Sequence, residues 1–176
     1  MSKTKGNVID PLDIVNGATL DVLLGRVDVE KPPDIEGVKK QIKKHFPKGI
    51  DAMGSDALRF CLAALNTGGS YIKLSVDRVQ IYRNFINKLW NATRFALMNF
   101  DGYDPERFEA QMLAKAGAEK MQERRAMLGV PERWLLSRLQ VVTEEVGTAL
   151  EAYKFADAAN AIWHFVYDDL CAWYVE

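Results

Sequence analysis

Apolar residues recur every three or four positions over three long stretches of the chain, which is the spacing of amphipathic helices. The first stretch runs from Val76 to about Phe100, the second opens at Pro131 and the third at about Phe155. Their apolar positions are Val79, Tyr82, Ile86, Leu89, Thr93, Ala96 and Phe100; Leu135, Leu139, Val142, Val146, Ala149 and Tyr153; and Ala159, Ile162, Val166, Leu170 and Trp173. Because each helix must cover its apolar face against another element, we expect a helical bundle.

Three shorter helices are predicted before this bundle from residues typical of helix ends. Asp10 followed by Pro11 is a typical helix start, and Gly17 a typical end. The same kinds of signal predict one helix that Asp34 opens and Pro47 stops, and one that Ser55 opens and Gly68 ends.

The remaining segments have less regular patterns. Short strands at 7–9 and 71–75 fit the β-branched and aromatic residues there, and we expect 104–129 to be a partly helical connection. The fold class is therefore mainly α. We expect a small α-rich connecting subdomain over 1–75 and a bundle over 76–176. Because the last residues are apolar and helical in pattern without a C-cap, we expect the bundle to be truncated there.

Composition narrows the class of protein. The chain has 176 residues, of which 48% are hydrophobic and 27% charged, so disorder and fibrous repeats are excluded. No apolar run approaches the roughly 18–20 residues of a bilayer span, and the first residues do not resemble a signal peptide. We therefore expect a cytoplasmic protein without a membrane partner. Two cysteines and two histidines, far apart, predict neither a disulfide framework nor a metal site.

The charge is distributed unevenly along the chain. Residues 1–100 hold 15 Lys and Arg against 10 Asp and Glu, whereas residues 101–176 hold 8 against 14. The first part is therefore the one suited to a polyanion. It opens with a cationic run, Met1 to Lys5, in which two lysines flank a hydroxyl residue. Such a loop can bind a phosphate, although by composition alone such a run is more often a solvated terminus.

Several segments form a series along the chain. They are Met1-Ser2-Lys3-Thr4-Lys5 with Gly6-Asn7-Val8-Ile9-Asp10-Pro11, Phe46-Pro47-Lys48-Gly49-Ile50, Gly54-Ser55-Asp56-Ala57-Leu58-Arg59-Phe60, Tyr82-Arg83-Asn84-Phe85-Ile86-Asn87-Lys88-Leu89-Trp90-Asn91-Ala92, Pro131-Glu132-Arg133-Trp134-Leu135-Leu136 and Cys171-Ala172-Trp173-Tyr174. The first of these segments resembles the KMSKS loop of class I aminoacyl-tRNA synthetases. The others resemble, in the same order, the segments that follow this loop in valyl-tRNA synthetases. Thr4 stands for the usual serine, the first lysine is absent, and loop 66–71 is one residue longer and lacks an arginine.

The resemblance implies a function and site residues. The family ligates valine to valine tRNA using ATP and Mg²⁺, so valine tRNA and the remaining synthetase domains are the implied partners. Met1, Ser2, Lys3 and Thr4 would contact ATP, with Lys3 as the catalytic cation. The His-Ile-Gly-His signature and its nucleotide-binding sheet are absent from this sequence. We therefore expect this stretch alone to bind no cofactor and to be inactive.

A second candidate site lies on the first long helix. Residues 78–100 contain four cations and no acid. Helical spacing places polar side chains roughly opposite the apolar stripe, where they suit RNA phosphates and bases. The predicted RNA-binding residues are Arg83, Asn87, Lys88, Asn91 and Arg94. Trp90 fits either a core position or a stacking platform.

Other interpretations remain open at this point. The lysines at 39, 40, 43, 44 and 48 form either a solvated face or a salt-sensitive contact with RNA. The whole stretch also fits the corresponding domain of an isoleucyl- or leucyl-tRNA synthetase, although the Phe46–Ile50 segment argues against that. A helical interaction module without an RNA role is the alternative from a different functional class.

Overall fold

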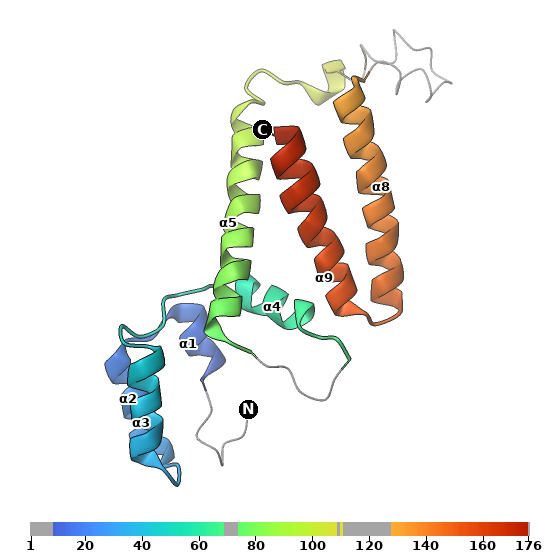
Figure 1. Cartoon of the computed structure of the whole chain (residues 1–176). Coiled ribbons are helices and arrows are strands. Elements are labelled where there is room, and N and C mark those ends of the chain that lie inside the picture. The colour runs from blue at the N-terminus through green and yellow to red at the C-terminus, as the bar shows by residue number, and fades with distance from the viewer. Residues whose placement is uncertain (1–8, 69–73, 109, 111–127, 176) are drawn as a thin grey trace. The chain divides into compact units, whose positions relative to one another are not determined.

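The computed structural model describes residues 9–68, 74–108, 110 and 128–175. Helices dominate these residues (Figure 1). The elements are α1 (Pro11–Asn16), α2 (Leu20–Glu30), α3 (Ile35–His45), α4 (Ser55–Ala64), α5 (Val76–Met98), α8 (Val130–Glu151), α9 (Phe155–His164) and the π-helix η2 (Phe165–Val175). The mainly α fold class is confirmed.

The chain divides into two compact units. The first unit contains residues 1–65 and 71–84, and the second contains 66–70 and 85–176. Helix α5 contributes its first nine residues to the first unit and the rest to the second. The predicted boundary between residues 75 and 76 stays a prediction.

Local capping explains how α1 forms. The Asp10 carboxylate accepts a hydrogen bond from the backbone N–H of Leu12 at 2.8 Å, and Pro11 occupies the first turn. Gly17 follows the helix at a φ of 80°, and a side chain there would meet the backbone of residues 50 and 52. The predicted ends of this helix are therefore confirmed, and the close approach explains why a glycine is needed.

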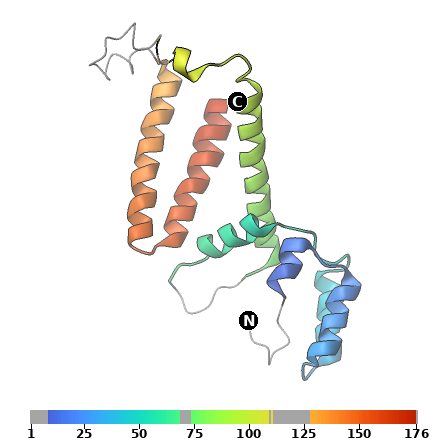
Figure 2. The ribbon, with the colours of Figure 1, turned by 180° about the vertical axis from the view of Figure 1, so that it is seen from behind.

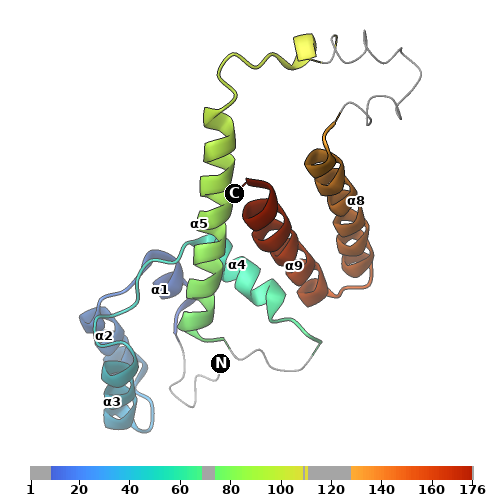
Figure 3. The ribbon, with the colours of Figure 1, turned by 45° about the horizontal axis from the view of Figure 1, so that its top comes forward.

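The second helix, α2, was not predicted. Its sequence contains three valines and Gly25, which all lower helix propensity, so its local pattern is a poor helix signal. Burial overrides this preference, because Leu23 and Val27 are each only 6% exposed, and α2 packs against α3. Figure 3 shows the two helices lying side by side. The Asp34 cap of α3 was predicted and is confirmed by its 2.9 Å bond from Gly37 N–H.

The core of the first unit lies among α1, α4 and the start of α5. Its buried side chains are Ile14, Met53, Ala57, Leu58, Cys61 and Val79. Ile9 packs against this cluster just before α1 begins. Helix α4 ends at Ala64, earlier than the glycines at 68 and 69 suggested.

The second unit is built from α8, α9, η2 and the remainder of α5. Figures 1 and 2 show α9 and η2 between the other two helices. Small residues, including Ala149, Ala156 and Ala159, are buried where α8 meets α9. Phe85 of α5 is 1% exposed and stacks on Trp163 with 4.6 Å between the ring centres. Short side chains and one aromatic stack therefore hold these helices together.

All three predicted apolar faces are only partly buried. Thr93 and Ala96 of α5 are exposed, as is Phe100, which lies beyond the end of that helix. Leu139 and Tyr153, predicted on the apolar face of the second long helix, are 44% and 80% exposed. The prediction that the last helix is one continuous α-helix was also wrong. From Phe165 onwards the chain forms the π-helix η2, whose i→i+5 hydrogen bonds change the rotation per residue. Trp173, predicted on the buried face, is consequently 78% exposed. The predicted strands at 7–9 and 71–75 and the 104–129 connection lie mostly outside the described residues.

Candidate nucleic-acid interface

The predicted ATP-binding residues Met1, Ser2, Lys3 and Thr4 lie outside the described residues. The described structure begins at Ile9, immediately before the cap of α1. At this end of the chain, the structure therefore describes only residues that follow the predicted loop. We call the contacts among Asp10, Asp13 and Arg26 there the anchor.

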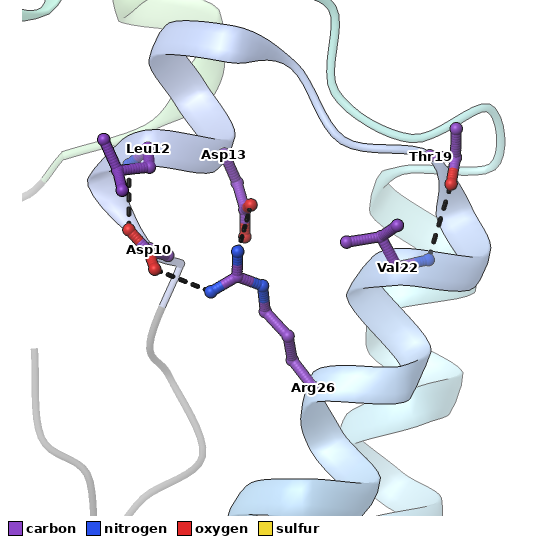
Figure 4. A network of polar contacts seen from close by, with 6 residues as sticks. All are labelled: Asp10, Leu12, Asp13, Thr19, Val22 and Arg26. Atoms are coloured by element: carbon purple, nitrogen blue, oxygen red, sulfur yellow. Dashed lines mark hydrogen bonds and ion pairs between the residues drawn. The ribbon is translucent and has the colours of Figure 1, made fainter.

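This anchor is a network of charged side chains from two helices (Figure 4). Arg26 of α2 donates from Nη1 to Asp10 Oδ2 at 2.6 Å and from Nη2 to Asp13 Oδ1 at 2.7 Å. The Asp13 side chain is 6% exposed, and its Oδ2 has no hydrogen-bond partner among the described residues. One guanidinium therefore serves two carboxylates, one of which is buried.

The two carboxyl groups respond differently to this arrangement. The hydrogen bond from Leu12 N–H, followed by the one from Arg26, lowers the pKa of Asp10. Burial raises the pKa of Asp13 and outweighs the attraction of Arg26, while the negative charge of Asp10 raises it further. Sequence reasoning assigned Asp10 only a capping role and missed Asp13 and Arg26. The three-residue spacing of the aspartates could have indicated a shared helix face, but nothing local indicates Arg26.

Four of the five predicted RNA-binding residues occupy one side of α5. At about 100° per residue, Arg83, Asn87, Asn91 and Arg94 lie within roughly a quarter turn of one another. Asn87, Asn91 and Arg94 are exposed in the second unit, whereas Arg83 is half-buried and belongs to the first. Neither arginine forms an ion pair with another described residue. The cationic and amide groups on this face are thus available to a ligand.

Lys88 lies at the edge of this face. It is about 100° round the axis from Asn87 and about 60° from Asn91, and its Nζ is 4.0 Å from the centre of the Tyr167 ring. The Tyr167 ring also stacks on Trp163, with 5.3 Å between centres and 5° between planes. The structure therefore gives Lys88 a cation–π contact within the second unit, at the border of the face that the other predicted residues share.

Trp90 is exposed to 69%, which settles its position on the surface of α5. A large aromatic side chain next to amides and a cation is a suitable stacking partner for an unpaired base. Of the two interpretations that the sequence left open for Trp90, the core position is wrong.

The lysines of α3 form a second cationic surface. Lys40, Lys43 and Lys44 are exposed, whereas Lys39 is half-buried and pairs with Asp28 at 2.6 Å. Exposed ammonium groups one helical turn apart can follow a phosphate backbone. Three of the four α3 lysines are thus available to an anionic partner.

Two acidic side chains of the second unit have side-chain partners within that unit. Asp169 accepts a hydrogen bond from Arg138 at 2.9 Å, and Asp168 lies 2.8 Å from Nδ1 of His164. Within the described ranges there is no group of three or more acidic, histidine or cysteine side chains arranged to hold a metal ion. Nor does any helix there have the length and hydrophobicity of a membrane span.

Comparison with known proteins gives consistent matches. Residues 132–176 match the anticodon-binding domain of tRNA ligase. All of the chain is similar to valine–tRNA ligases from Dechloromonas aromatica (42% identical), Xylella fastidiosa strain M23 (44%) and Acinetobacter baylyi (40%). The chain spans 18%, 18% and 17% of the length of these relatives, respectively. No solved structure matches it significantly.

These relatives agree with the resemblance seen in the sequence, and their similarity extends through both units of the fold. The matched anticodon-binding segment covers α8 from its third residue onwards, together with α9 and η2. The chain is therefore similar over its whole length to one segment of valine–tRNA ligases, and its last part is similar to the anticodon-binding domain of tRNA ligase.

Proposed function

We propose that this chain is the part of a cytoplasmic valine–tRNA ligase that holds the end of the ATP-binding loop and contacts the tRNA. The parent enzyme would ligate valine to valine tRNA, with ATP as substrate accompanied by Mg²⁺. The observation that carries this proposal is similarity to valine–tRNA ligases over 100% of the chain. The nucleotide-binding and editing domains of the same enzyme are its proposed partners.

Lys3 is the proposed catalytic residue. When the valine carboxylate attacks the α-phosphorus of ATP, negative charge grows on the departing pyrophosphate. A lysine ammonium on a loop next to these oxygens stabilises that charge more in the transition state than in bound ATP. Met1 and Ser2 would shape the loop, and the Thr4 hydroxyl would donate a hydrogen bond to a phosphate oxygen. Lys3 thus acts by charge and position, without taking part as a nucleophile or base.

The α5 surface is the proposed RNA contact. Arg83 and Arg94 would pair with phosphates, Asn87 and Asn91 would hydrogen-bond to bases or sugars, and Trp90 would stack on an unpaired base. The exposure of Asn87, Asn91 and Arg94 supports this assignment. Lys88 borders this surface and keeps its contact with Tyr167.

Binding of tRNA tests this function directly. The chain is titrated with labelled valine tRNA, and with the same tRNA carrying a changed anticodon, at several salt concentrations. Base-specific contact predicts a preference for the native anticodon of about 1–3 kcal/mol. Phosphate contact alone predicts equal affinities that fall steeply with salt.

Substitutions on α5 and on α8 test whether the α5 surface is the one that contacts tRNA. Asn91→Ala with Arg94→Ala should reduce affinity for tRNA, whereas Arg133→Ala, which removes an exposed cation from α8, should have a smaller effect. Absence of tRNA binding at low salt would contradict an RNA contact in this chain. Binding without salt dependence would favour the interaction-module alternative.

A further inference from the structure

A column of three stacked aromatic rings in the second unit ends at the ammonium group of Lys88. Phe85 of α5, which is 1% exposed, stacks on Trp163 of α9 with 4.6 Å between the ring centres. Trp163 stacks in turn on Tyr167 of η2, with 5.3 Å between the centres. The Nζ atom of Lys88 lies 4.0 Å from the centre of the Tyr167 ring. Because Phe85 is buried and closely packed, the column has a fixed base.

The Tyr167 ring holds the ammonium group without neutralising its charge. Among the described residues, no carboxylate forms an ion pair with Lys88, and Asp168, which follows Tyr167, lies 2.8 Å from Nδ1 of His164 instead. The face of an aromatic ring attracts a cation through its quadrupole and carries no net charge. An ammonium group has three N–H donors, and a ring can take only those on one side. Lys88 therefore keeps its positive charge and has N–H groups left for a phosphate oxygen.

Lys88 also stands next to the polar face of α5. Asn91 lies three residues further along the helix, and side chains at that spacing are neighbours. Asn91 is exposed and Lys88 is half-buried, so Lys88 is where the packed side of α5 meets the surface proposed to bind RNA. A lysine that is free in solvent loses rotamer freedom when it binds a phosphate. A lysine already held over a ring has given up much of that freedom before the RNA arrives.

We infer that Tyr167 is a positioning residue for Lys88: its ring holds the ammonium group in place for a phosphate of the bound RNA. This inference rests on the RNA contact proposed for α5. It extends the set of residues that matter for RNA binding from α5 to η2, and it gives the cation–π contact a role in binding as well as in folding.

The test is titration of the full chain with labelled valine tRNA across a series of salt concentrations. Lys88→Met should weaken binding and make the log–log salt slope less steep by about 0.7–0.9, which corresponds to one lost phosphate contact. Tyr167→Leu should weaken binding by about threefold to tenfold, because Lys88 must then be ordered when the RNA binds. Tyr167→Phe keeps the ring, so its affinity should stay within about twofold of wild type.

Each of these substitutions has a matched control in the same unit. Tyr174→Leu changes a tyrosine of η2 that is 40% exposed, against 39% for Tyr167. Lys154→Met removes an exposed lysine between α8 and α9. Tyr174→Leu should bind tRNA as wild type does, and Lys154→Met should leave the salt slope unchanged.

A double-substitution cycle separates positioning from a general effect on the fold. If Tyr167 acts through Lys88, then Tyr167→Leu should weaken tRNA binding much less in a Lys88→Met background than in wild type. Equal losses in both backgrounds would overturn the inference, and so would an unchanged salt slope for Lys88→Met.

A change of ring chemistry keeps the inference testable if Tyr167→Leu does not fold. Ring-fluorinated phenylalanine at position 167 keeps the shape of the phenylalanine ring but weakens the negative charge on its face. The fluorinated protein should bind tRNA more weakly than Tyr167→Phe. Equal affinities of these two proteins would overturn the inference.

The inference and the proposed RNA contact fail in different ways. Absence of tRNA binding by wild type, or unchanged binding by Asn91→Ala with Arg94→Ala, would refute the α5 surface and the inference with it. Weak binding by that double variant together with normal binding by Lys88→Met would refute only the role of Lys88 and Tyr167. Thermal unfolding of every variant shows whether a loss of binding exceeds the loss of folded protein.

Discussion

At the scale of single residues, Asp10 and Asp13 bind one guanidinium, yet their pKa values move in opposite directions. Asp10 is half-buried and accepts a backbone N–H, so its charged form is favoured. Asp13 is buried, so its charged form is disfavoured despite the attraction of Arg26. Proton binding therefore affects the folded state with opposite signs at two sites three residues apart.

The pH dependence of stability should show these opposite signs. The folded pKa of Asp10 is below its unfolded value, so its contribution is present above the ordinary value of 3.8 and is lost as pH falls through the folded pKa. The folded pKa of Asp13 is raised, so protonation there favours the folded state as pH falls.

Urea unfolding of the chain between about pH 3 and 7 checks this prediction. The stability advantage of wild type over Asp10→Asn should shrink as the pH falls, whereas wild type should gain relative to Asp13→Asn. Asp51→Asn, at an exposed position, serves as the control. Parallel pH curves for wild type and both variants would contradict the assignment.

At the scale of elements, α5 carries different chemistry on different sides. One side packs Phe85 against Trp163 and holds Lys88 over Tyr167, and another exposes Asn87, Asn91 and Arg94. Rotation of about 100° per residue is enough to separate neighbours in sequence into these roles. Packing and ligand binding on this helix should therefore respond to different substitutions.

Lys88→Met should lower the free energy of unfolding by about 0.5–1 kcal/mol, because it removes the cation–π contact with Tyr167 and keeps most of the aliphatic chain. Asn91→Ala, on the exposed side, should change that free energy by less than about 0.5 kcal/mol. Urea unfolding of the two variants measures the difference. Equal stabilities would show that the Tyr167 contact contributes nothing.

Helix α3 presents its lysines as a group. Replacing Lys40, Lys43 and Lys44 together by glutamine should make the salt dependence of tRNA binding less steep, by about 0.9 in the log–log slope for each duplex phosphate that the variant no longer neutralises. Arg59, Arg133 and Lys154, replaced together by glutamine, give a control of equal charge change. Titration of both proteins with tRNA across a salt series provides the slopes. An unchanged slope for the α3 variant would assign these lysines to a solvated face.

At the scale of the whole molecule, the chain contains two compact units and represents under a fifth of each relative compared. Its sequence has the second lysine of the predicted signature loop but not the His-Ile-Gly-His signature. Charge stabilisation of pyrophosphate by one loop is useful only where ATP and valine are already held together.

Residues 1–176 alone should therefore not catalyse valine-dependent exchange of pyrophosphate into ATP. The full-length ligase is the positive control, measured at equal molar concentration. Turnover by the isolated chain that depends on both valine and Lys3 would contradict this prediction and would place a complete nucleotide site within it.

Prediction from the sequence succeeded where a local interaction decides the structure. The Asp10 and Asp34 caps each bond to a backbone N–H two or three residues away, so adjacent residues carry the signal. On α5, helical spacing correctly placed Asn87, Asn91 and Arg94 on the surface, but it failed for Thr93 and Ala96, which were predicted on the apolar face and are exposed. Prediction also failed for α2, where packing against α3 outweighs the low helix propensity of valine and glycine.

By itself, the sequence determined the mainly helical class, the ends of α1 and α3, the resemblance to one synthetase family and the polar face of α5. These properties depend on residue order and on interactions within a few positions. Only the tertiary structure decided that Arg26 binds both Asp10 and Asp13, that Lys88 faces Tyr167 and that the π-helix η2 exposes Trp173. Each of those outcomes depends on packing between segments far apart in the chain, or on a helical geometry that residue spacing does not specify.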